Sequence, residues 1–240
     1  MIARFALLVT LALSLAGCAG VGTVTSGPPA DAPALKVGDQ WVYRGHEGYR
    51  VGMEWQETHE VTAIDASGIT VHVTYDGERL HGDRYEVLQA PGLVRQGALM
   101  DIETRRFAQP LQRYVFPLEP GETWNQWVDN LNETTRKSGS INRYVRVEGW
   151  QKIATPAGTF DALRMRVLMR LDDEEFWRYP TTCNYLVWYA PAVGATVREE
   201  KEAEYLERSD PMDGMGAVRA AHAARARVVP PRGLAITRVA

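Results

Sequence analysis

A row of arginines is the pattern in this chain that could most readily do chemistry. The row consists of Arg164, Arg166 and Arg170. Residues two apart share one face of a strand, and a guanidinium holds a carboxylate or phosphate through two parallel hydrogen bonds. If the row lines the mouth of a concave surface, it binds an anionic head group or a carboxylate. The alternative is that it pairs across the sheet with an acidic row formed by Glu200, Glu202 and Glu204.

Aromatic side chains would form the wall behind such a mouth. All seven tryptophans lie between Trp41 and Trp188, which places the folded core in that window. A curved sheet with Trp55, Trp150, Trp177 and neighbouring methionines on its inner side leaves an apolar cavity. We therefore predict that Trp150 and Trp177 bind a ligand together with the three arginines.

Other reactive residue types are scattered. The histidines are His46, His59, His72, His81 and His222. None has an i, i+2 or i, i+4 partner that would direct two donors at one ion, so we predict no metal site. The chain has no Gly-x-Ser-x-Gly motif and no glycine-rich phosphate loop, and the adjacent acids at 172–175 are typical of a solvated loop. We predict a protein that is not an enzyme and needs no cofactor, with a hydrolase as the least favoured alternative.

The chain begins like an export signal. A basic residue precedes an apolar run over residues 5–15, which is too short to span a bilayer. Leu15-Ala16-Gly17-Cys18 resembles a bacterial lipobox, in which the cysteine after the cleavage site is acylated. The resemblance implies a signal peptide over residues 1–17 and attachment to a membrane through lipid on Cys18. Ala19 at the next position implies the outer membrane, with the protein facing the periplasm.

Charge and cysteine content narrow the function further. The 27 basic and 30 acidic residues are interspersed, and the formal net charge is −3, so nothing points to nucleic acid as a partner. If Cys18 carries lipid, Cys183 is the only thiol left and an intramolecular disulfide is excluded. We expect Cys183 to be a small buried apolar residue rather than a reactive thiol.

Composition divides the chain after the signal peptide into three segments. Residues 18–34 are rich in Gly, Ala, Pro, Ser and Thr, which predicts a flexible tether because little apolar surface offsets the ordering entropy. Residues 35–208 are predicted to form one β domain. Residues 209–240 are rich in Ala and Arg and predict a flexible tail or a marginal helix.

Period-two alternation dominates the β domain. Apolar residues alternate with polar ones over 69–75 and 163–171, which is typical of antiparallel strands buried on one face. Pro156-Ala157-Gly158 predicts a hairpin between two strands. Helical signals are sparse, and only 125–131 fits a short helical turn. Further strands are predicted at 41–49, 53–64, 83–90, 93–96, 99–104, 144–153, 184–189 and 196–206.

Four motifs together resemble a known family. They are Gly38-Asp39-Gln40-Trp41, the stretch from Phe116 to Trp124, Thr155-Pro156-Ala157-Gly158-Thr159-Phe160, and Trp188-Tyr189-Ala190-Pro191-Ala192-Val193-Gly194. In this order they resemble poorly characterised bacterial envelope proteins, which include the TapB-like proteins. The resemblance spans residues 35–208 and implies an antiparallel all-β domain with no catalytic residue. Two of the motifs place a glycine, an acid and a tryptophan in series, which predicts a tight turn before a strand whose indole packs inward.

Together these patterns predict an all-β fold with few helices. We expect a single antiparallel, strongly curved sheet that forms an open barrel or half-barrel. The expected function is that of a non-enzymatic, membrane-anchored envelope lipoprotein that binds an apolar or amphipathic ligand or an envelope component. The alternative is a structural protein that docks onto an envelope partner through a sheet edge or the tail.

Overall fold

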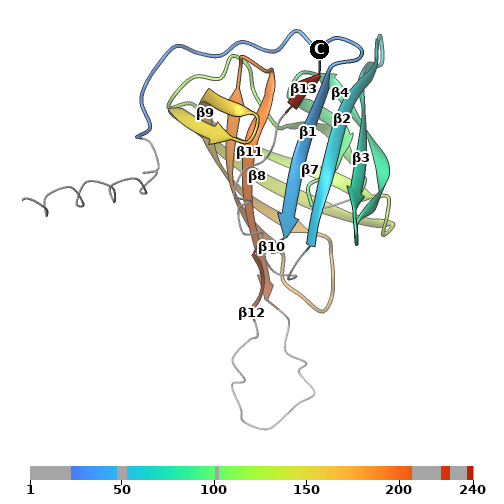
Figure 1. The fold of residues 1–240 in the computed structure, drawn as a ribbon. Coiled ribbons are helices and arrows are strands. Elements are labelled where there is room, and N and C mark those ends of the chain that lie inside the picture. Colours follow the sequence, from blue (N-terminus) through green and yellow to red (C-terminus); the bar gives the residue numbers. More distant parts are fainter. Residues whose placement is uncertain (1–22, 48–52, 101–102, 207–222, 228–236, 240) are drawn as a thin grey trace, which may run out of the picture.

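The computed structural model describes residues 23–47, 53–100, 103–206, 223–227 and 237–239. These residues form one antiparallel sheet, in which β1 to β11 follow one another in chain order, with β12 beside β11 and β13 beside β1. The sheet curves into a nearly closed, barrel-like shape (Figure 1), which confirms the predicted fold class. Within the described ranges there is no helix that could cross a membrane.

The strands are β1 (Gln40–Glu47), β2 (Met53–Asp65), β3 (Gly68–Gly77), β4 (His81–Ala90), β5 (Leu93–Gly97), β6 (Arg105–Gln112), β7 (Thr123–Asn132), β8 (Lys137–Thr155), β9 (Gly158–Asp172), β10 (Thr181–Ala190), β11 (Ala195–Leu206), β12 (Ala223–Arg227) and β13 (Thr237–Val239).

The period-two pattern marks the inner face of the sheet as predicted. On β3 the apolar residues from Ile69 to Tyr75 are buried at every second position. On β9 the register places Met165 between Val147 of β8 and Val187 of β10, and all three are buried. Neighbouring strands thus bury apolar side chains at the same level, which is the main stabilising contact of a sheet with one inner face.

Tight turns precede β1 and β7 as the glycine motifs predicted. Gly38 and Gly121 have φ angles of 90° and 94°, in the left-handed region that favours glycine. Trp41 is buried, and its Nε1 donates to the Val193 carbonyl at 3.0 Å. Trp124 is half-buried against the core. The hairpin between β8 and β9 is also confirmed, because Thr155 lies opposite Gly158.

Two predicted elements are wrong, because buried polar residues interrupt the alternation of apolar and polar residues that indicates a strand. Residues 125–131 belong to β7 and not to a helical turn, and Asn130 and Asn132 face inward on that strand. The strand predicted at 99–104 lies at β6 instead. Arg105, which begins β6, is buried because it pairs with Glu103 and Asp173 at 2.8 and 2.6 Å.

Residues 23–39, called here the N-terminal strap, run along the upper end of the sheet to the start of β1 (Figure 1). Thr25 exchanges backbone hydrogen bonds with Trp150, and Ala30 does so with Leu118. Gly27 lets the strap lie on the Trp150 indole, since a Cβ there would fall 2.4 Å from the ring. The described part of the predicted tether is therefore packed on the sheet, through backbone hydrogen bonds and the burial of Ala30 in the core. The signal peptide and Cys18 lie outside the described residues.

The predicted C-terminal tail also contributes to the sheet. β12 pairs with β11, and β13 pairs with β1, so each outermost strand of the β1 to β11 meander gains a partner. Pairing of this kind satisfies backbone groups that a sheet edge otherwise leaves open. The other residues of segment 209–240 lie outside the described part of the chain.

Candidate functional site

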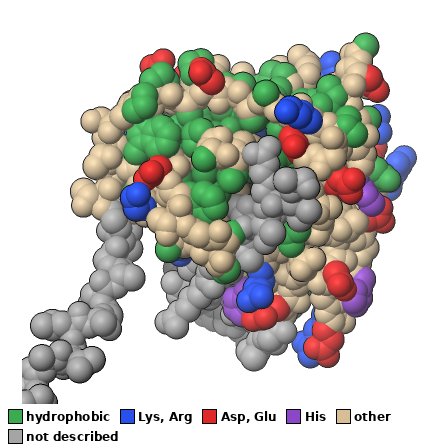
Figure 2. All heavy atoms as spheres, turned by 45° about the horizontal axis from the view of Figure 1, so that its top comes forward, with side chains coloured by type: hydrophobic (Ala, Val, Ile, Leu, Met, Phe, Trp, Pro, Cys, Tyr) green, Lys and Arg blue, Asp and Glu red, His purple; other side chains and the backbone are tan. Residues whose placement is uncertain are grey.

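A cavity of about 330 Å³ lies inside the curved sheet. Its wall includes residues from β1 to β4, β8, β10 and β11, and Pro33 and Leu35 of the N-terminal strap. Figure 2 views the molecule from the end that the strap crosses, where hydrophobic side chains gather. Cavities of about 300–1,000 Å³ with apolar walls and a few polar groups are typical of small-molecule sites.

Aromatic rings form much of the cavity wall. They belong to Trp41, Tyr43, Trp55, Tyr75, Tyr114, Phe116, Tyr185 and Tyr189. Tyr114, Phe116 and Tyr189 contact one another, with ring centroids 5.4–5.9 Å apart. Trp55 of β2 lies against Gly45 of β1, where a Cβ would come within 2.1 Å of the ring. Gly45 therefore allows the indole to lie on the inner face of the sheet.

A network of ion pairs crosses the interior beside these rings. Glu86 of β4 accepts a 2.6 Å hydrogen bond from Arg84 and two, of 2.9 and 3.2 Å, from Arg113. Arg84 also donates to the Tyr75 hydroxyl at 2.7 Å. Glu57 of β2 lies 3.7 Å from Arg84. Each charge in this network thus has an opposite charge within reach, as buried charges require.

The network holds its carboxylates in the charged form. Burial by itself would raise the pKa of Glu86, but the charges of Arg113 and Arg84 and the hydrogen bonds from Arg113 outweigh it, so the pKa falls well below its usual range. For Glu57, burial again opposes ionisation, and the hydrogen bond with His59 and the charge of Arg84 lower the pKa overall. Both carboxylates are therefore ionised at neutral pH.

A second ion pair lies on β11. Lys201 Nζ lies 2.6 Å from Glu199 Oε1 and donates to the Leu99 carbonyl at 3.3 Å. The ammonium also lies 5.2 Å from the centre of the Tyr185 ring, a cation–π geometry. Burial would lower the pKa of Lys201, but Glu199 raises it overall. This lysine is charged and paired.

Arg143 of β8 differs from the other cations of the cavity. Its side chain donates to the Gln112 carbonyl at 2.7 Å, and among the described residues no carboxylate forms an ion pair with it. The residue is 6% exposed. Burial lowers the pKa of Arg143 to about 10, so the guanidinium still carries its charge at neutral pH.

Two further donors of the cavity wall have no partner among the described residues. They are the hydroxyl of Tyr189, a residue that is 2% exposed, and Nε1 of Trp55. Burial raises the pKa of Tyr189, so its hydroxyl keeps its proton at neutral pH. A buried donor without an acceptor costs about 1–3 kcal/mol, and a ligand with acceptor atoms would remove that cost.

The predicted arginine row lies elsewhere. Arg164 and Arg166 both bind Glu148 of β8, and Arg170 is exposed on the same outer face of β9. The expected pairing with the acidic row of β11 is wrong, because β10 lies between β9 and β11. None of the three arginines belongs to the described cavity wall. Their ligand binding stays a prediction.

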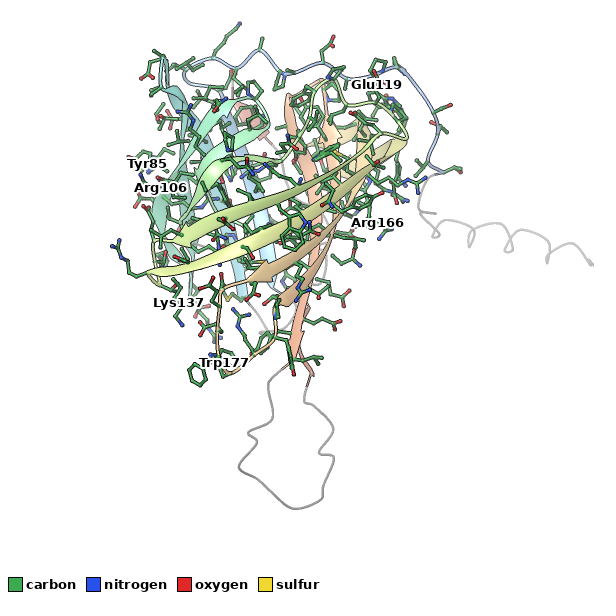
Figure 3. The ribbon with its side chains drawn as sticks, turned by 180° about the vertical axis from the view of Figure 1, so that it is seen from behind. Tyr85, Arg106, Glu119, Lys137, Arg166 and Trp177 are labelled. Atoms are coloured by element: carbon green, nitrogen blue, oxygen red, sulfur yellow. The ribbon has the colours of Figure 1, made fainter. Side chains whose placement is uncertain are left out.

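The two predicted tryptophans also lie outside the described cavity wall. Trp150 supports the strap and donates from Nε1 to the Pro28 carbonyl at 2.9 Å. Trp177 follows β9 and stacks edge-on against Tyr205. Figure 3 shows Trp177 at the lower end of the molecule and Arg166 on its outer side. Trp55 is the residue of the predicted aromatic wall that does line the cavity.

The expected cavity is present, but its wall is not wholly apolar, because seven charged groups also line it. They are Glu57, Arg84, Glu86, Arg113, Arg143, Glu199 and Lys201. A sequence signal for two of them exists on β11, where Val197 and Ala203 are buried and Glu199 and Lys201 continue the same alternation between them. When charged residues occupy the inward-facing positions of a strand, they indicate a polar interior.

Cys183 and two of the described histidines, His59 and His72, have structural contacts. Cys183 is buried on β10, as predicted, and burial raises the pKa of its thiol to about 11. His59 binds Glu57 at 2.6 Å and His72 binds Asp83 at 2.8 Å. In the described ranges no cluster of three or more His, Cys, Asp or Glu side chains could hold a metal ion.

Comparison with known proteins adds two distant similarities. No protein-family model matches the sequence, and no curated protein matches it. A "putative exported protein with YMCC-like fold" from Bacteroides fragilis is 14% identical with a TM-score of 0.47, and the match covers 72% of this chain and 92% of that one. A "putative lipoprotein" from Parabacteroides distasonis is 14% identical with a TM-score of 0.42, and the match covers 76% of this chain and 94% of that one. Similarity at this level assigns neither a family nor a function.

Proposed function

We propose that this protein is a bacterial envelope lipoprotein, anchored in the outer membrane through Cys18, whose domain binds a small amphipathic ligand in its interior. The observation that supports ligand binding is the cavity of about 330 Å³, with aromatic walls and unpartnered buried donors. The lipobox motif supports the anchor, and the four family motifs support membership of the TapB-like envelope proteins.

Cavity size limits the ligand. A water molecule occupies about 30 Å³ of liquid, so the cavity of about 330 Å³ has room for about 11 non-hydrogen atoms. A medium-length acyl chain or a compact aromatic acid fits this volume. A complete membrane lipid with two or three acyl chains does not.

Binding is favoured over hydrolysis by the chemistry of the wall. The described lining residues include no serine or cysteine that could act as a nucleophile. Glu57 and Glu86 have lowered pKa values, which make them weak general bases and exclude them as proton donors at neutral pH. We therefore propose a non-enzymatic role.

Calorimetric titration with 1-octanol tests the proposed function. Cys18→Ser removes the lipid-attachment residue and leaves every described residue unchanged, so the titrations use the full chain with this substitution. Burial of seven methylenes at about 0.8 kcal/mol each corresponds to a Kd of about 0.1 mM. Ala98→Trp fills part of the cavity from its lining and should abolish binding, whereas Leu168→Trp on the outer face of β9 should not. Equal binding by both variants, or none by the parent protein, would refute the proposal.

Docking onto an envelope partner is the second candidate function. The loop between β9 and β10 exposes Phe176 and Tyr179, at 84% and 52%, and exposed aromatics of this kind are enriched at protein interfaces. A photocrosslinking residue in place of Phe176 should trap one defined envelope protein in intact cells, and the same residue in place of Tyr85 on β4 should not. Identical products from both positions would reject this loop as the contact.

A further inference from the structure

The charges of the cavity do not balance. Its wall carries the four cations Arg84, Arg113, Arg143 and Lys201 and the three carboxylates Glu57, Glu86 and Glu199. With neutral histidines the described wall has one positive charge in excess. A buried charge without a counterion is costly, so the interior is complementary to a single negative charge.

The surplus charge belongs to Arg143. Arg84 and Arg113 are both bound to Glu86, and Lys201 is bound to Glu199. Arg143 binds a neutral backbone carbonyl, is 6% exposed and lines the cavity. That carbonyl, of Gln112, also accepts a hydrogen bond from Trp124, so it does not depend on Arg143. The guanidinium is therefore available to an anion inside the cavity.

The other unpartnered polar groups of the described wall are hydrogen-bond donors, which match the acceptor atoms of an anion. The Tyr189 hydroxyl and Trp55 Nε1 can both donate hydrogen bonds, and each lacks a partner in the described part of the chain. A carboxylate offers only acceptors and carries one charge, whereas a phosphate monoester carries nearly two at neutral pH. The aromatic wall suits an apolar body attached to that carboxylate.

From this charge count and geometry we infer that the ligand is a monocarboxylic acid of about ten non-hydrogen atoms in all, with an apolar body, and that Arg143 binds its carboxylate. The inference rests on the proposed function, because it names the ligand class of the same cavity. It assigns specificity to a residue on the inner face of β8 and not to the arginine row on the outer face of β9.

Paired titrations with octanoate and 1-octanol, which share an eight-carbon chain, test the inference in the Cys18→Ser protein. We expect octanoate to bind about tenfold to a hundredfold more tightly, as a charge-assisted hydrogen bond provides. Arg143→Gln should reduce this preference to less than about twofold, and Arg143→Lys should keep part of it because it keeps the charge. Arg170→Gln makes the same change at an exposed arginine and should keep the full preference for octanoate.

The outcomes separate the two proposals. Equal affinity for the acid and the alcohol in the parent protein overturns the inference and leaves the proposed function standing. A preference for octanoate that survives Arg143→Gln also overturns it, because another group must then bind the carboxylate. Absence of binding by both probes refutes the proposed function and the inference together. The comparison in the parent protein decides the ligand class even if Arg143→Gln fails to fold.

Discussion

Glu86 is the residue on which the buried ion-pair network depends, and Glu86→Gln is the sharpest test of the interior. Its side chain is 4% exposed and binds both Arg84 and Arg113. Glutamine has the same shape but no charge, so the substitution leaves Arg113 without a counterion among the described residues and Arg84 with only Glu57, 3.7 Å away. Breaking a buried ion pair by removing one partner costs about 3–5 kcal/mol. For a chain of this size that corresponds to a fall in Tm of roughly 6–20 °C.

Thermal unfolding followed by circular dichroism measures this effect. The matched control is Glu133→Gln, which breaks the pair with Arg106, a side chain that is 64% exposed. An exposed pair contributes at most about 1 kcal/mol, so the control should lower Tm by less than about 4 °C. If the Tm of Glu86→Gln falls no further than the Tm of this control, the network does not stabilise the fold in the way the structure indicates.

The pH dependence of the same variant provides a second check. The folded-state pKa of Glu86 lies below the ordinary value of 4.5, so its contribution to stability is complete above about pH 4.5 and declines as pH falls toward the folded-state pKa. Acidification from pH 5 to pH 3 should therefore narrow the difference in unfolding free energy between the parent protein and Glu86→Gln. A difference that stays constant over this range would contradict the assignment of the effect to the Glu86 charge.

Three further predictions follow from individual contacts. Arg143→Met removes a buried cation without an ion pair and should raise the unfolding free energy by about 1–3 kcal/mol in urea denaturation; a decrease would show that the charge is compensated. Cys183, buried with a pKa of about 11, should react with iodoacetamide at pH 8 only after urea unfolds the chain, and rapid labelling of the native protein would contradict its burial. Trp150→Ala removes the indole that supports the strap and should speed hydrogen exchange at the Thr25 amide about tenfold or more, with Trp177→Ala as the unaffected control.

The strands show why part of the fold could be predicted from sequence. Alternation over residues 69–75 and 163–171 reflects the geometry of a strand, whose successive side chains point to opposite faces. The glycine turns at Gly38 and Gly121 are equally local, because a left-handed φ angle is tolerated best by glycine. Local rules of this kind do not need the partner strand to be known.

The same rules failed where polar residues face inward. β7 was predicted as a helical turn because Asn130 and Asn132 interrupt its apolar period, and β6 was misplaced because Arg105 begins it. The burial of Arg105 depends in part on Asp173, which follows β9 and forms an ion pair with it. The sequence contains both residues but not their distance, so the period appears broken.

The candidate site was largely beyond local reasoning. The arginine row was read correctly as one face of β9, but that face is the outer one. Arg143 and the pair of Glu86 with Arg113 had no pattern of their own, since the partners are far apart in the chain. On β11, Glu199 and Lys201 occupy positions in the alternation that face inward, and this was the signal that could have indicated a charged interior.

By itself the sequence determined the strands, the turns and the burial of Cys183, because each follows from the geometry of a few adjacent residues or from a composition that local physics constrains. Only the tertiary structure decided which face of each strand encloses the cavity, which charges pair across it and that Arg143 has no described carboxylate partner. Those features depend on distances between strands, and electrostatic pairing in a desolvated interior is sensitive to such distances over a few ångströms.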